Sequence, residues 1–163
     1  MKSEKGMTLI TTAVLVVVIA ALVSAVIYYA RIAIAKEELE SLKTDMLLVQ
    51  AKVKKITGEY TLEQKEELLK GTKIDEMAEN ATIQNFLEKE IIDVEEENKK
   101  YYVLDKQNLE ELDLQKVKLK EDSYYIVEYT SNEVYYTKGV EYADGNTYYD
   151  IKEIENLEAS EVE

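Results

Sequence analysis

The sequence predicts an α+β protein in which one long N-terminal helix packs against a small C-terminal antiparallel sheet. Residues 7–30 carry no charge and are mostly Val, Ile, Leu and Ala. Apolar residues then recur with a period of 3.5 over residues 31–57, the spacing of one buried helix face. From residue 101 the period changes to two, and tyrosine-rich runs alternate with turn residues, which is typical of short strands.

Residues 7–30 are the apolar half of the predicted helix. About 20 apolar residues, each rising about 1.5 Å, cross a hydrocarbon core of about 30 Å. A helix also satisfies its backbone N–H and C=O groups internally, as a single segment in lipid must. Tyr28, Tyr29 and Arg31 follow where the far lipid–water interface would lie. Basic residues flank both ends of the span, so charge does not decide its orientation.

The junction in front of this run is Lys5-Gly6-Met7-Thr8-Leu9. It resembles the prepilin signal of type IV pilins and type II secretion pseudopilins, over residues 1 to about 35. The resemblance implies that prepilin peptidase cleaves after Gly6 and N-methylates Met7. It also implies that the apolar helix then moves from the bilayer into a filament core, with other pilin-like subunits and an assembly platform as partners. The rival reading is a conventional signal peptide cleaved near Ala33-Ile34-Ala35, but the apolar run exceeds a normal h-region.

Thr11 departs from the family pattern. In that family the fifth residue after the cut is usually Glu, and the resemblance implies that this Glu pairs with the amino terminus of a neighbouring subunit. Thr11 offers a hydroxyl but no countercharge. Burying an unpaired ammonium costs several kcal/mol, so the departure favours a minor or tip subunit over a major, repeating one.

Composition excludes several kinds of chemistry. With 20 Lys+Arg against 34 Asp+Glu, the net charge is −14, which opposes direct nucleic-acid binding. Cysteine and histidine are absent, so disulfides, thiolate nucleophiles, imidazole bases and Cys/His metal sites are impossible. We therefore expect no enzyme activity, no catalytic residue, no metal and no cofactor.

The second half of the predicted helix carries an apolar seam. Its members are Leu39, Leu42, Met46, Val49, Val53 and Ile56. The seam could pair with a second copy in a parallel coiled coil, or it could receive the chain's own sheet. We favour the sheet, because the C-terminal strands need an apolar surface to cover. The helix is predicted to end at Gly58.

Residues 58–100 are predicted to hold short helices and a linker. Thr61-Leu62-Glu63-Gln64 matches a capping box, and the helix that it would start should run to Leu69. A second short helix is predicted over residues 82–90. Asn80-Ala81-Thr82 matches a glycosylation acceptor, a short pattern that also occurs by chance.

Residues 101–152 are predicted to form a tyrosine-rich antiparallel sheet of three or four strands. The strand-like segments from which this sheet would be built are residues 101–104, 124–129, 133–137, 140–142 and 147–149, and Asp105 is expected to cap a helical turn. The tyrosine pairs are read as cross-strand packing rather than a stacking platform for ligands. Asp144, Asn146 and Asp150 could bind calcium, but hairpin turns use the same residues.

The predicted organisation is a leader (1–6), a transmembrane or filament-core helix (7–30), its amphipathic continuation (31–57), short helices and a linker (58–100), the β region (101–152) and a solvated acidic tail (153–163). The expected function is that of a pilin-like subunit of a type IV pilus, or of a secretion or DNA-uptake (competence) pseudopilus. Its precursor would be a single-pass membrane protein with an extracytoplasmic head, and its mature form would lie in a surface filament. The alternative is a single-span, membrane-anchored coiled-coil adaptor or sensor.

Overall fold

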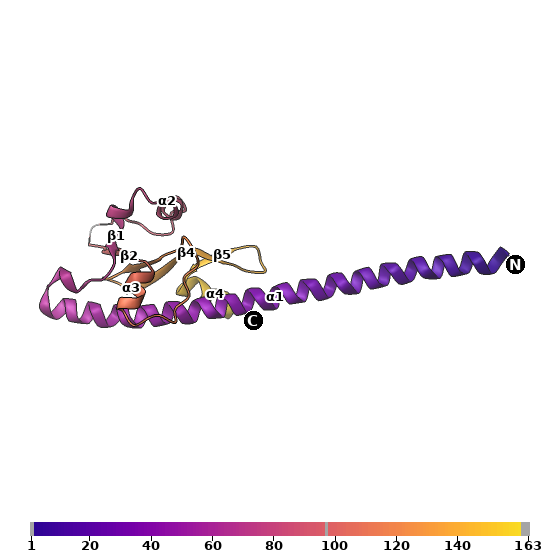
Figure 1. Cartoon of the computed structure of the whole chain (residues 1–163), viewed down its shortest axis with the longest axis horizontal. Coiled ribbons are helices and arrows are strands. Elements are labelled where there is room, and N and C mark those ends of the chain that lie inside the picture. Colours follow the sequence, from indigo (N-terminus) through magenta and orange to yellow (C-terminus); the bar gives the residue numbers. More distant parts are fainter. Residues whose placement is uncertain (1, 97, 161–163) are drawn as a thin grey trace.

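The computed structural model describes residues 2–96 and 98–160, with side chains from residue 11 onward. Helix α1, Lys2–Glu63, has 62 residues and is about 93 Å long. Its N-terminal half extends alone, and its C-terminal half carries the rest of the chain as a compact head (Figure 1). The predicted α+β layout is confirmed: a long N-terminal helix and an antiparallel sheet.

The head is built on a five-stranded antiparallel sheet, in the order β1-β2-β3-β4-β5. Its strands are β1 (Thr72–Lys73), β2 (Tyr101–Leu104), β3 (Tyr125–Glu128), β4 (Glu133–Glu141) and β5 (Thr147–Asp150). The remaining helices are α2 (Ala81–Leu87), α3 (Lys106–Glu111) and α4 (Ile151–Ser160), with 3-10 turns at Glu66–Leu68 and Ile74–Met77. Helix α1 covers one face of the sheet and α2 lies over the other (Figure 1).

Strand alternation divides the buried residues into two cores. Tyr102 and Val127 lie opposite each other in the β2–β3 register and face α1. Ile126 and Tyr135 are paired between β3 and β4, and they pack with Phe86 beneath α2. Because both faces are covered, all four positions of β2 and all four of β3 are buried.

The apolar seam of α1 lies against this sheet. All six seam residues are buried, and Met46, Val49 and Val53 are fully inaccessible to solvent. They share one core cluster with strand residues such as Tyr125 and Val127. Burying a side chain of this size contributes about 1.5–3 kcal/mol, so the seam is the main attachment between helix and head.

The prediction that α1 ends at Gly58 is wrong. A glycine inside a helix costs only about 1 kcal/mol, and the buried Ile56 and half-buried Tyr60 hold the helix on both sides of Gly58. The helix ends after Glu63, where Gln64 takes a φ of 55°.

The predicted capping box is also wrong, because its residues lie in the last turn of α1. The Thr61 hydroxyl donates to the Thr57 carbonyl at 2.7 Å, and the Gln64 amide donates to the Thr61 carbonyl at 2.9 Å. The helix predicted to run to Leu69 is only the 3-10 turn Glu66–Leu68. The second short helix is present as α2, shorter than predicted and capped by Asn80.

The sheet has five strands, more than the three or four predicted. The additional strand, β1, pairs its two residues with Val103 and Tyr102. The two predicted strands at 133–137 and 140–142 are one continuous strand, β4, with an irregularity between Tyr135 and Val140. Gly139 lies there with a φ of +58°, and a Cβ on it would come within 2.8 Å of the Tyr148 carbonyl oxygen. The predicted strand at 101–104 and the Asp105 cap are confirmed.

The prediction of a frayed acidic tail is wrong for residues 153–160, which belong to α4. Ile154 is fully buried, and Ile151 and Leu157 pack against the same core. Lys43 of α1 donates to the Glu158 carboxylate at 2.7 Å, so an acidic segment acquires a basic partner from the long helix. Residues 161–163 lie outside the described part of the chain.

Candidate functional site: the apolar rod and its junction with the head

The strongest functional feature is the exposed apolar part of α1, residues 11–30, which we call the rod. Large apolar side chains around its surface are about half exposed or more, from Val18 at 48% to Tyr29 at 70%. Within the described residues, α1 is long and apolar enough to cross a membrane, and none of its most apolar window is buried by the head. A helix that is apolar all round requires either lipid or other helices around it.

Few polar groups interrupt the rod. The Ser24 hydroxyl donates to the Ala20 carbonyl at 2.8 Å, one turn earlier, which makes the serine compatible with an apolar surrounding. Tyr28 and Tyr29 pack edge to face with centroids 5.7 Å apart, at the end of the rod that meets the head. Amphipathic rings of this kind favour a lipid–water interface.

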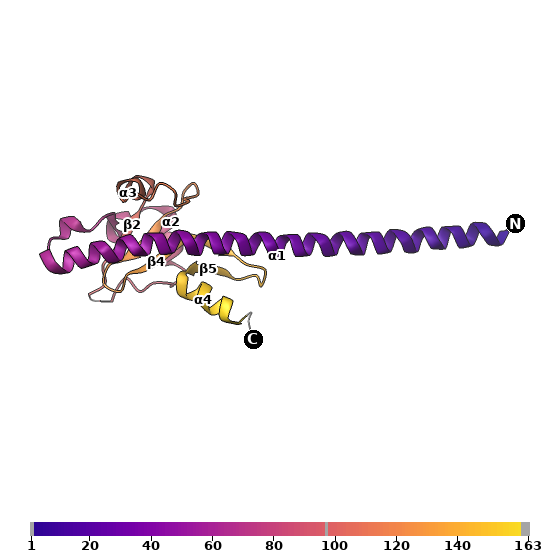
Figure 2. The same cartoon turned by 90° about the horizontal axis from the view of Figure 1, so that it is seen from below.

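The rod enters the head without a hinge. The α-helix is continuous through Ile34, which is 58% exposed, to Leu39, the first fully packed seam residue. Neither Gly nor Pro occurs between residues 7 and 57, so no kink is expected there. Helix α1 therefore runs unbroken from the rod into the head (Figure 2).

The predicted processing junction is only partly described. Residues 2–10 are helical, but the side chains of Lys5, Met7, Thr8 and Leu9 lie outside the described residues, and cleavage after Gly6 stays a prediction. Thr11 is exposed at the N-terminal end of the rod.

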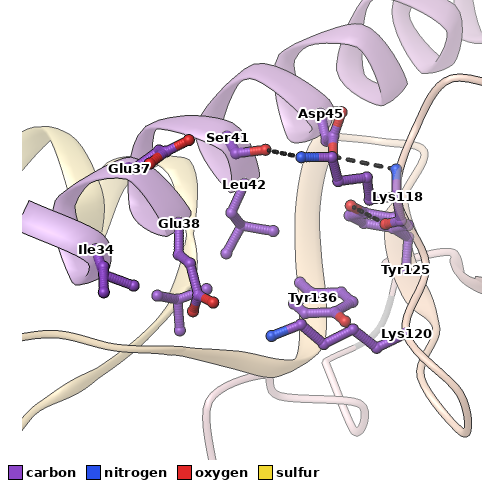
Figure 3. Close-up of a pocket in the computed structure, with 11 residues that line it drawn as sticks. Ile34, Glu37, Glu38, Ser41, Leu42, Asp45, Lys118, Lys120, Tyr125 and Tyr136 are labelled. Atoms are coloured by element: carbon purple, nitrogen blue, oxygen red, sulfur yellow. Dashed lines mark hydrogen bonds between the residues drawn. The ribbon is translucent and has the colours of Figure 1, made fainter. Parts of the chain in front are cut away.

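A groove opens where the rod joins the head, between α1 and the segment that leads into β3 (Figure 3). Its floor is apolar, with Leu42, Tyr125, Tyr136 and Val140. Its rim carries acidic residues from α1 and two lysines, Lys118 and Lys120, from the opposite segment. This groove could not be predicted from the sequence, because its walls come from parts of the chain more than 70 residues apart.

Two buried carboxylates of the head have structural partners. Burial alone would raise the pKa of Glu128, but N–H groups of Lys100, Ser131 and Thr130 bond its oxygens and lower that pKa. Burial raises the pKa of Asp45, whose Oδ2 accepts the Lys118 N–H at 3.1 Å. Both groups tie segments of the head together.

In the β4–β5 hairpin, the aspartate oxygens considered as calcium ligands accept hydrogen bonds from within the chain. One Asp144 oxygen accepts the Asn146 N–H, and the other accepts the Asn146 amide and the Tyr148 hydroxyl. Asp150 accepts the Glu153 N–H at the start of α4. In the described part of the chain, no group of three or more acidic residues is positioned to hold a metal ion.

The tyrosine pairs and the Asn80-Ala81-Thr82 pattern have structural roles as well. The buried tyrosines pack on one another, with ring centroids of Tyr102 and Tyr129 5.3 Å apart. Asn80 caps α2, and its amide donates to the Tyr124 hydroxyl at 3.1 Å, so the nitrogen that a glycan would need already has a partner.

No protein-family model, curated protein or solved structure matches the chain. Its function must therefore be inferred from the N-terminal junction, the exposed rod and the way the head is attached to α1.

Proposed function

We propose that this protein is a pilin-like structural subunit of a type IV pilus, or of a secretion or DNA-uptake pseudopilus. Its precursor is anchored in the membrane by the rod, cut between Gly6 and Met7, and assembled through the same rod into a filament. The observation that carries the proposal is the combination of a prepilin-like junction with a rod that the head leaves uncovered.

Assembly needs little net change in apolar burial. Lipid tails and neighbouring apolar helices both cover apolar side chains, so association depends on close packing and not on a hydrophobic gain. The rod has small residues one turn apart, at Ala20 and Ser24 and at Ala21 and Ala25, which allow neighbouring helices to approach closely. Assembly machinery could therefore move the rod between the two surroundings at modest free-energy cost.

Thr11 favours a subunit of low copy number. A mature amino terminus at Met7 would bring a charge into the filament core, and Thr11 offers it no carboxylate. A position at the tip or among other subunits, where the charge meets water or another chain's carboxylate, avoids the cost of burying it unpaired.

The seam argues against the coiled-coil adaptor. All six seam residues are covered by the chain's own head, so a second copy could pair with them only if the head detached. Detachment would expose a large apolar surface to water, which opposes it.

The mature N-terminus tests the proposal. Mass spectrometry of the protein from cells that contain prepilin peptidase should find N-methylated Met7 as the first residue. A Gly6→Leu variant should keep its leader, whereas Ser3→Leu, in the same leader, should be processed. Intact Met1 in the wild-type protein, with an active peptidase present, would overturn the proposal.

A further inference from the structure

We draw no further inference here: the strongest candidate, the exposed surface patch that Leu47 and Leu48 form on the part of α1 that carries the head, is an unpartnered helix face, and nothing in the structure shows what covers it.

Discussion

The hydroxyl of Tyr129 makes two hydrogen bonds with the backbone of Lys70: it accepts from the N–H at 3.0 Å and donates to the carbonyl at 2.9 Å. Tyr129 is 2% exposed, so these bonds are made inside the core. These bonds hold the segment after α1 against the end of β3, at a place where the two segments are not paired as strands.

Tyr129→Phe should lower the free energy of unfolding by about 1–3 kcal/mol, because two hydrogen bonds to the Lys70 backbone are lost. Chemical denaturation of the full chain in detergent, followed by circular dichroism, measures the change. Tyr149→Phe is the matched control, since no described residue bonds the Tyr149 hydroxyl while its ring packs on Phe86. Equal effects of the two substitutions would contradict the role given to Tyr129.

Met46→Ala tests the seam. Met46 is fully buried between α1 and the sheet, so its truncation should cost about 2–5 kcal/mol of stability. Leu48→Ala, two residues along the same helix at 45% exposure, should change stability by no more than about 0.5 kcal/mol. If the seam instead paired two copies, the loss for Met46→Ala would depend on protein concentration, which denaturation at two concentrations would reveal.

Glu128 should make the head sensitive to acid. Its pKa is lower in the folded protein than in the unfolded chain, so its contribution is fully present above the unfolded value and is lost as the pH falls through the folded one. Glu128→Gln should therefore reduce stability near pH 7 by about 1.5–3 kcal/mol, with the gap to the wild type closing below about pH 4. Thermal unfolding across this range measures the gap.

Asp45 acts in the opposite direction, since burial raises its pKa and its ionisation opposes folding as the pH rises. The acid sensitivity of Glu128 is therefore measured as the difference in stability between wild type and Glu128→Gln, in which the contribution of Asp45 cancels. Glu141→Gln, at the exposed C-terminal end of β4, is the control. A gap that stays constant from neutral to acid pH would contradict the role of the Glu128 carboxylate.

Ile154→Ala should detach α4 from α1. The fully buried Ile154 anchors a helix whose exposed face is strongly acidic, and loss of this contact should cost about 2–5 kcal/mol. Hydrogen exchange should then show faster exchange over 151–160 than over the strands of the sheet. Asn156→Ala, on the exposed side of α4, should leave the exchange unchanged.

The long helix, the seam and both hairpins follow from periodic patterns in the local sequence of each element. Leu39 to Ile56 repeat every 3.5 residues, and the strand pairs flank Asn132 and Gly145 at their turns. Such features depend on neighbours in the sequence, which is why they were predictable.

The features that sequence did not predict depend on distant contacts. Strand β1 has only two residues and exists because β2 supplies its partner. Helix α4 lies in an acidic segment, and only the helical spacing of Ile151, Ile154 and Leu157 could have indicated it. Lys43, more than 100 residues away in the sequence, stabilises this helix by its bond to Glu158. The groove likewise forms only when the segment around Lys118 docks on α1.

The central claim is that the rod leaves the bilayer for a filament. Its most direct test is to shear surface filaments from cells that contain the assembly machinery and to measure how much of the chain is in the sheared fraction and how much stays in the membrane. We predict that wild-type protein appears in the filament fraction with Met7 at its amino terminus, whereas Gly6→Leu stays in the membrane. Wild-type protein found only in the membrane fraction, with Met1 intact, would contradict the account.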